Sequence, residues 1–319
     1  MFTELRDARA VRVILGRKAR IASRRMLQQR RNRRSVAVEL ADGSRFVVKY
    51  YWRAALVAQE AARLAVANAF PAVDTPRLRG STRHHLLQDL VPGEEFDAIA
   101  KRLSREDRLP LFTRAAGVLA AIHGSKRPTV AGLRLAEPCA PAHLAARMRR
   151  AWNEIEANGF CRWEAQQGSV PERWRRAFGE LRIERLVREL ASTGDACVLG
   201  HGDFHPRHLL VTPDDRLFVV DWIAMSLVTP WIELAHLLLR RLPLAQYDAV
   251  TAAYLEAMQR QGLLRDVSLV QGATLAASAL LYDHLIVAKH GVRKLAGPGQ
   301  PGQVAAFRAS LDALAEASD

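Results

Sequence analysis

The strand-forming and helix-forming segments of this chain are segregated along its 319 residues. Residues 35–51 carry two runs of β-branched and aromatic residues on either side of Asp42 and Gly43, and this pattern is a strong hairpin signal. The apolar run at 10–15 predicts a further strand, and the run at 84–96 predicts an edge strand followed by a connector. Extended segments in the first third therefore predict a small sheet.

Helical patterns occupy most of the remaining sequence. Residues 52–70 are rich in Ala and Leu and contain no Gly or Pro, so they predict one long helix. The extended segment 196–222 interrupts the later helices, and 297–303 is typical of a flexible loop. We therefore expect an α+β protein with a sheet-containing lobe at 1–92 and a larger helical lobe at 93–319. The later helices are expected at 107–123, 141–158, 171–191, 231–241, 243–261 and 266–290.

The composition is that of a soluble globular protein, with 49% hydrophobic residues. No run approaches the roughly 18 to 20 uninterrupted apolar residues of a spanning helix. The first twenty residues lack the apolar core of a secretory signal. Cys139, Cys161 and Cys197 are far apart and show no CxxC spacing, so we expect reduced thiols and a cytoplasmic protein.

Positive charge is concentrated near the N-terminus. The formal net charge is +14, and residues 17–34 hold nine Lys and Arg residues and no acidic residue. Such a segment attracts phosphorylated sugars, the acidic inner face of a membrane, or nucleic acid. Its alternative is a solvated arm or helix face. No nucleic-acid-binding motif accompanies the charge, so a nucleic-acid partner is the least favoured of these.

Residue types that are capable of catalysis occur close together in the extended segment 196–222. Asp203 lies in a His-Gly-Asp sequence, and Asp221 follows an apolar strand that is expected to pair with another across Pro213–Asp215. Two carboxylates at strand ends suit phosphoryl transfer, because one can orient a hydroxyl while the other holds Mg²⁺ against nucleotide phosphates. Asp221 alone has a simpler alternative, which is to cap a turn.

Three histidines in the same segment raise the possibility of a metal cluster. His201, His205 and His208 would share one side of a helix, but Pro206 argues against a helix there. A zinc hydrolase is therefore disfavoured.

The sequences HGDFHPRHLL (201–210), VVDW (219–222) and PWIELAHLL (230–238) resemble the signature of aminoglycoside phosphotransferase-type kinases. This resemblance implies a bilobal protein-kinase-like fold that uses ATP and Mg²⁺. It implies that Lys49 contacts nucleotide phosphates and that Glu60 pairs with this lysine. By the same resemblance, Asp203 is the catalytic acid, His201 braces the catalytic loop, Asp221 holds Mg²⁺ and Glu233 is structural. The alternative for Lys49 and Glu60 is an ordinary surface lysine and helix glutamate.

Two features depart from the family pattern. His208 stands where the family has Asn, and imidazole is a poor ligand for Mg²⁺, although lipopolysaccharide core-sugar kinases are similar in carrying His there. His208 is therefore a candidate both for the catalytic site and for the metal site. The glycine-rich phosphate loop is also missing, because Gly16 is the only glycine in residues 1–42. Phosphate contacts are then expected from Lys49 and from basic side chains of residues 17–34.

Three functions fit these observations. The first is a kinase of a hydroxyl on a small-molecule or glycan acceptor, with an anionic lipopolysaccharide-type sugar favoured by the net charge and by His208. The second is an antibiotic phosphotransferase, although residues 139–190 show a basic excess instead of an acidic cluster. Trp163, Trp174 and Phe178 are expected to pack this helical insert, which the resemblance makes the acceptor wall. The third is a pseudokinase or polyanion-binding module.

Overall fold

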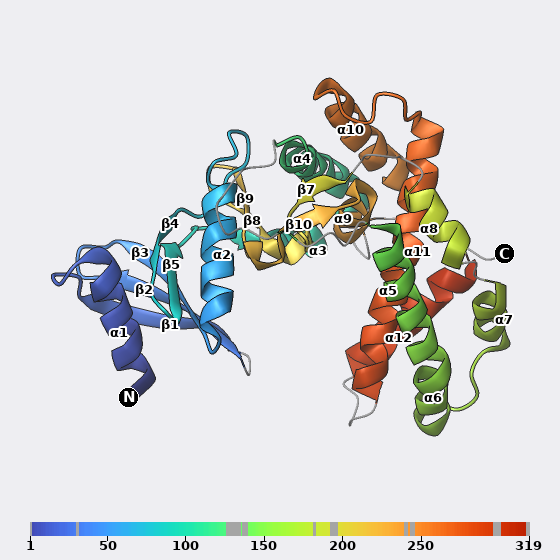
Figure 1. The fold of residues 1–319 in the computed structure, drawn as a ribbon, viewed down its shortest axis with the longest axis horizontal. Coiled ribbons are helices and arrows are strands. Elements are labelled where there is room, and N and C mark those ends of the chain that lie inside the picture. Colours follow the sequence, from blue (N-terminus) through green and yellow to red (C-terminus); the bar gives the residue numbers. More distant parts are fainter. Residues whose placement is uncertain are drawn as a thin grey trace. The chain divides into compact units, whose positions relative to one another are not determined.

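The computed structural model describes residues 2–29, 32–125, 135, 140–180, 183–191, 197–238, 242, 246–295 and 301–316 (Figure 1). The chain divides into two compact units, each assembled from separate stretches of sequence. The first contains Met1–Ser104, Ser125–Leu135 and His201–Met225, and the second contains Arg105–Gly124, Ala136–Gly200 and Ser226–Asp319. The lobe boundary between residues 92 and 93 stays a prediction.

The first unit is built on a five-stranded antiparallel sheet in the order β1-β2-β3-β5-β4. The hairpin predicted around Asp42 and Gly43 is confirmed, and Gly43 supplies the positive φ of 83° that its turn requires. The edge strand predicted within 84–96 is wrong in its position, because a short unpredicted strand pairs on its outer side. The strands are β1 (Ile21–Gln29), β2 (Arg33–Leu40), β3 (Arg45–Tyr51), β4 (Leu78–Ser81) and β5 (His85–Asp89).

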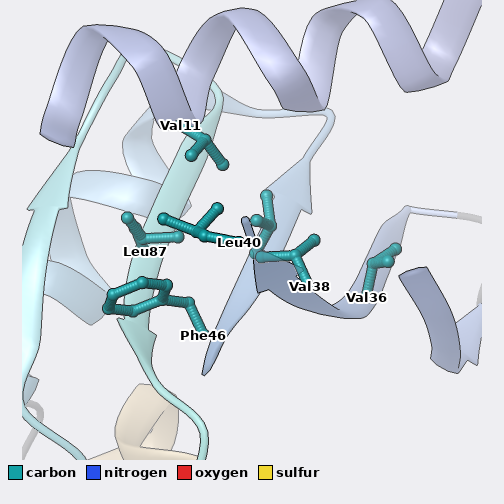
Figure 2. Packing of buried hydrophobic residues seen from close by; sticks show 7 residues of the cluster. Val11, Val36, Val38, Leu40, Phe46 and Leu87 are labelled. Atoms are coloured by element: carbon teal, nitrogen blue, oxygen red, sulfur yellow. The ribbon is translucent and has the colours of Figure 1, made fainter. Parts of the chain in front are cut away.

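One face of the sheet packs on a helix that the sequence did not predict. Residues 10–15 were expected to form a strand, but they lie in α1 (Phe2–Leu15). Tertiary packing overrides their β propensity, because Val11 on the helix is fully buried against the sheet (Figure 2). The resulting core consists of Val11, Val36, Val38, Leu40, Phe46, Val48 and Leu87.

The basic segment 17–34 is neither a solvated arm nor a helix face in its described part. Its central residues form the edge strand β1, on which Arg24 and Arg25 are exposed. Arg34, on β2, is half-buried and donates to Asp7 at 2.7 Å. The segment is thus divided between exposed charges and charges that have partners inside the unit. Contact with an acidic membrane stays a prediction.

In its described residues, the rest of the first unit consists of two helices, a small second sheet and the turns of residues 201–225. The helix predicted at 52–70 is confirmed as α2 (Ala54–Ala67). The predicted strand pair across Pro213–Asp215 is confirmed as β8 (Leu209–Val211) and β9 (Leu217–Val219). The unpredicted β6 (Glu94–Glu95) extends this pair to three strands, and it leads into α3 (Phe96–Arg102). Two short 3₁₀ turns, η2 (Pro206–His208) and η3 (Trp222–Ala224), complete the segment.

The second unit is mainly helical. The predicted helices are confirmed in the described residues, whereas positions 181–182, 239–241 and 243–245 of the expected helices lie outside the described part. The helix at Phe160–Gln167 was not predicted, and part of the expected loop at 297–303 begins an unpredicted helix at Pro301. The helices are α4 (Arg105–His123), α5 (Pro141–Glu154), α6 (Phe160–Gln167), α7 (Glu172–Glu180), α8 (Ile183–Ala191), α9 (Pro230–Leu238), α10 (Tyr247–Arg260), α11 (Leu269–Leu295) and α12 (Pro301–Glu316). A π turn, η1 (Ile155–Gly159), joins α5 to α6, and β7 (Val198–Gly200) pairs with β10 (Ser226–Val228).

Aromatic and polar contacts organise this helical unit. The rings of Trp163 and Trp174 meet edge to face at 4.9 Å, which confirms the expected packing for these two residues, whereas the side chain of Phe178 lies outside the described part. Glu233 is buried and accepts a hydrogen bond from His123 Nε2 at 2.9 Å. The Tyr254 hydroxyl lies 2.6 Å from the other ring nitrogen of His123. This network supports the expected structural role of Glu233.

The structure also bears on the expectations about a membrane-spanning helix and about the cysteines. The stretch Leu269–Val292 of α11 is long and apolar enough to cross a membrane by length and composition alone, and half of its tested window is buried inside the protein. Cys197 is disulfide-bonded whereas Cys161 is free and exposed, so the expectation of reduced thiols is wrong for Cys197.

Candidate functional site

A buried ion pair anchors the site in the first unit. Lys49 Nζ on β3 donates to Glu60 Oε1 on α2 at 2.5 Å, and both side chains are almost fully buried. The Tyr51 hydroxyl donates to the other Glu60 oxygen. Burial alone lowers the pKa of Lys49, but the negative charges of Glu60 and Asp221 outweigh this effect and raise the pKa. Lys49 is therefore a fixed cation, not an ordinary surface lysine.

Asp221 lies where β9 ends and reaches the same ion pair. Its backbone adopts the left-handed conformation, with φ of 66° and ψ of 56°, and its carboxylate lies 3.4 Å from Lys49 Nζ. The residue makes no side-chain hydrogen bond that would cap the following turn. The indole of Trp222 stabilises this turn by donating to the Val219 carbonyl at 3.0 Å. The structure thus disfavours the turn-capping alternative for Asp221.

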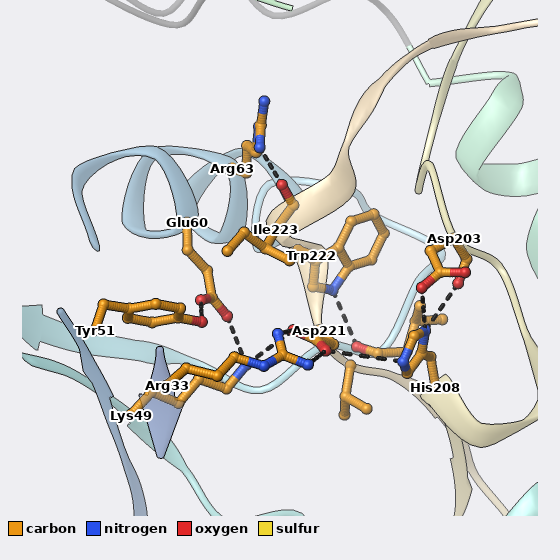
Figure 3. A network of polar contacts seen from close by, with 12 residues as sticks. Arg33, Lys49, Tyr51, Glu60, Arg63, Asp203, His208, Asp221, Trp222 and Ile223 are labelled. Carbon is orange, nitrogen blue, oxygen red and sulfur yellow. Dashed lines mark hydrogen bonds and ion pairs between the residues drawn. The ribbon is translucent and has the colours of Figure 1, made fainter. Parts of the chain in front are cut away.

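Arg33 is a site residue that the sequence did not single out. Its guanidinium lies against both oxygens of Asp221, with Nη2 to Oδ2 at 3.1 Å and Nη1 to Oδ1 at 3.4 Å (Figure 3). Burial raises the pKa of Asp221, but the charges of Lys49 and Arg33 outweigh burial and hold this pKa well below its usual range. The only sequence signal for Arg33 was its place in the basic segment.

The His-Gly-Asp loop is tied to the strand that carries Asp221. His201 is fully buried, its Nε2 donates to the Val220 carbonyl at 3.0 Å, and its Nδ1 accepts from the Asp203 N–H at 3.3 Å. These contacts agree with the bracing role expected for His201. Gly202 turns the loop with φ of 83°, and a Cβ there would meet the Ala224 carbonyl oxygen at 1.9 Å.

Substituting Gly202 by Ala is expected to damage this loop. The left-handed backbone alone costs about 1–2 kcal/mol for a residue with a Cβ, and the backbone of Ala224 cannot easily move away. Thermal unfolding should show a lower midpoint, and phosphoryl transfer should be lost. Gly43→Ala is the matched control, because Gly43 has the same φ of 83° but leaves open space for a Cβ. Equal stability of the two variants would contradict the close approach at Gly202.

His208 connects the two aspartates of the site. Its Nδ1 donates to the Asp203 carbonyl at 2.8 Å and lies 3.5 Å from Asp203 Oδ2. Its Nε2 lies 3.8 Å from Asp221 Oδ2. Within the described residues, no group of three or more His, Cys, Asp or Glu side chains is placed to hold a metal ion. Both ring nitrogens of His201 are engaged by backbone groups, which disfavours the zinc cluster of His201, His205 and His208.

The donor set of the site fits a magnesium–nucleotide complex better than a metal held by protein alone. Mg²⁺ in nucleotide sites is bound through one or two carboxylates together with substrate phosphates. Asp221 supplies an ionised carboxylate, because its pKa is low. The nitrogen of His208 does not suit Mg²⁺, so the metal-binding part of the expectation for His208 is not supported by the donor chemistry.

A pocket of about 530 Å³ opens beside these residues, within the size range of small-molecule sites. Its charged lining combines the basic residues Arg33, Lys49, Lys101 and Arg207 with the acidic residues Asp89, Glu95, Asp97 and Asp221. An apolar lining accompanies these charges, so the pocket offers both charged and apolar contacts to a ligand. The apolar side chains are Leu27, Val47, Leu90, Val91, Leu210 and Val220.

Comparison with known proteins relates the chain to phosphate-transferring enzymes. The family model described as "Phosphotransferase enzyme family" matches residues 25–264. Among solved structures, a type I macrolide 2'-phosphotransferase is 17% identical with a TM-score of 0.61, and 98% of this chain and 96% of that chain are covered. A GDP complex of an aminoglycoside 2'-phosphotransferase-IIIa mutant is 14% identical with a TM-score of 0.64, covering 98% and 96%. A choline kinase from Streptococcus pneumoniae is 16% identical with a TM-score of 0.63, covering 99% of each chain. No protein of curated function matches the sequence.

Proposed function

The chain belongs to the phosphotransferase enzyme family, and from this premise we propose that its first unit binds MgATP and transfers the γ-phosphoryl group to a hydroxyl of a small-molecule or glycan acceptor. The observation that carries this proposal is that Lys49, Asp221 and His208 line one pocket, with His208 lying 3.5 Å from the Asp203 carboxylate. It is an ATP-dependent phosphotransferase with the bilobal α+β fold of kinases, and a pseudokinase is not favoured.

Residues in and beside the pocket have different parts in the proposed reaction. Lys49 offers a permanent positive charge to the nucleotide phosphates, and Glu60 fixes its ammonium in place. Asp221 holds Mg²⁺, which neutralises the charge that develops on the phosphates when it is bound. The carboxylate of Asp203 is about half exposed, so an acceptor hydroxyl can reach it. Asp203 then orients this hydroxyl and accepts its proton.

His208 acts by positioning Asp203, in this proposal, instead of ligating the metal. The hydrogen bond from its Nδ1 to the Asp203 carbonyl fixes the loop, and its distance of 3.5 Å to Asp203 Oδ2 places it beside the reacting carboxylate. His201 supports the same loop from its buried side.

Replacing His208 by Asn is expected to lower kcat by about tenfold to a hundredfold, because the ring that braces Asp203 is lost, while KM for MgATP changes little. Steady-state kinetics with varied MgATP and acceptor concentrations measure kcat and KM separately. An unchanged or higher kcat for His208→Asn would contradict the positioning role and would make His208 a tolerated substitute for the family asparagine.

The acceptor is proposed to be anionic. The formal net charge of +14 favours an acceptor that carries phosphate or carboxylate groups, such as a lipopolysaccharide-type sugar, over a polycationic antibiotic.

An acceptor screen tests the proposed function. The full chain is incubated with MgATP and sugars, phosphorylated sugars, lipopolysaccharide fragments, choline, aminoglycosides or macrolides, and ADP release is measured. We expect transfer to an anionic glycan, with none in the Asp203→Asn variant. Preferential turnover of an aminoglycoside or macrolide would contradict the anionic acceptor while preserving the phosphotransferase function.

A further inference from the structure

The nucleotide site needs phosphate-binding groups that the usual loop does not supply. In protein kinases a glycine-rich loop covers the phosphates. In this chain residues 17–42, which include β1, its connection to β2 and β2 itself, contain no glycine. Other hydrogen-bond donors must therefore project from the same two strands toward the nucleotide.

Arg33 occupies the position from which such a donor can act. It is the first residue of β2, and it lies opposite Tyr51 in the sheet register, while Ser35 lies opposite Lys49. Directly opposed residues of antiparallel strands project from the same face. The side chains of Arg33 and Lys49 consequently share one face of the sheet, and both line the 530 Å³ pocket.

The present partner of Arg33 is the carboxylate that the metal requires. The two guanidinium contacts, at 3.1 and 3.4 Å, occupy both oxygens of Asp221. Both side chains are only 20% and 17% exposed, so this ion pair is shielded from solvent. Mg²⁺ and the guanidinium carry the same sign and compete for the same oxygens. A metal ion held by Asp221 would therefore displace the guanidinium toward the pocket that Arg33 lines.

A released guanidinium finds an equivalent partner in the nucleotide. Phosphate oxygens accept two parallel hydrogen bonds from the guanidinium fork, as a carboxylate does. We propose that Arg33 is an exchange ligand: it neutralises Asp221 in the empty site, and it binds the nucleotide phosphates in place of a glycine-rich loop once Mg²⁺ occupies Asp221. This inference rests on the proposed function, because it assigns a residue to the same nucleotide site.

Removal of Arg33 should have opposite effects on nucleotide and on metal. In Arg33→Gln, calorimetry should show MgATP binding that is weaker by about tenfold to a hundredfold, as expected for loss of hydrogen bonds to a charged group. Mn²⁺ alone, followed by the loss of its free-ion electron paramagnetic resonance signal, should bind about threefold to fivefold tighter, because a competing ion pair is absent. An Arg33→Gln/Asp221→Asn double variant should lose this gain.

Controls separate this exchange from a structural ion pair. Arg24→Gln removes an exposed arginine of β1 that lies opposite Val38, on the other face of the sheet, and both affinities should equal those of the wild type. Arg33→Lys keeps the charge but loses the fork, so it should keep part of the MgATP affinity and serve as the test if Arg33→Gln does not fold. MgATP affinity within twofold of wild type in both Arg33 variants would overturn the proposal. Weakened binding of both MgATP and Mn²⁺ would also overturn it, since a structural ion pair predicts that result.

MgATP binding by the wild-type protein distinguishes failure of the exchange role of Arg33 from failure of the proposed function. If wild type binds MgATP and the Arg33 variants bind it equally well, the exchange role is wrong and the proposed function stands. If wild type itself fails to bind MgATP, both are wrong.

Discussion

Asp203→Asn should bind MgATP with nearly wild-type affinity and lose phosphoryl transfer by about 10²- to 10⁴-fold, the usual contribution of a positioned general base. The substitution keeps the shape of the side chain and removes the charge that accepts the acceptor proton. The backbone N–H of Asp203, which donates to His201, and its carbonyl, which accepts from His208, both remain. The loop should therefore keep its conformation.

Calorimetry with MgATP and single-turnover transfer to an acceptor measure the two parts of this result. Asp214→Asn is a suitable control, because Asp214 is an exposed carboxylate in the turn between β8 and β9. If Asp203→Asn retained most of the turnover, the proton-accepting role would belong to another residue. If it lost MgATP binding as well, Asp203 would have to be reassigned to nucleotide binding.

Asp221→Asn is expected to reduce turnover by about 10²- to 10³-fold, comparable to removing one group that stabilises charge in a transition state. Asn is preferable to Ala here because Asp221 has a left-handed backbone, which Asn tolerates and Ala does not. A loss of activity in the Asn variant thus reports the charge and not backbone strain. MgATP should also stabilise this variant less in thermal unfolding, and wild-type stabilisation would contradict the assignment of the metal-binding carboxylate.

The same variant should reveal a pH dependence of stability in metal-free and nucleotide-free buffer. Lys49 and Arg33 hold the pKa of Asp221 below its unfolded value of about 3.9, so the ionised carboxylate stabilises the fold above about pH 4. This contribution decreases as the pH falls through the pKa of the folded state. The urea midpoints of wild type and Asp221→Asn should differ by a constant amount between pH 5 and 8 and converge below pH 4.

Local signals explain what could be predicted from the sequence. The Asp42-Gly43 turn and the Ala-rich α2 follow from conformational preferences of adjacent residues, and both are found in the structure. The helix α1 was not predicted, because its β-branched residues resemble a strand until Val11 has the sheet to pack against. The short strand β4 was not predicted, because its four residues give too weak a local signal and the strand is defined by its pairing with β5.

In the candidate site, likewise, the residues of local motifs could be predicted, whereas the residue that depends on tertiary contacts could not. Lys49, Glu60 and Asp221 belong to motifs that can be recognised one segment at a time, and the structure brings them together. Arg33 belongs to no motif, because its part depends on the register of β2 against β3 and on the turn that aims Asp221 at it. Registers and turns of this kind arise from tertiary contacts between segments that are distant in the sequence.

The division of the first unit between residues before 105 and residues 201–225 has a consequence for how the protein is made. Lys49 and Asp221 are 172 positions apart, yet they share one ion pair. During synthesis from the N-terminus, the ribosome must therefore translate the whole segment between these two residues before Asp221 can meet Lys49. Until then Lys49 has Glu60 but no Asp221, and the strands β8 and β9 are missing from the unit. A nascent chain that stops before residue 201 thus cannot assemble this site, and nucleotide can favour folding only late in synthesis.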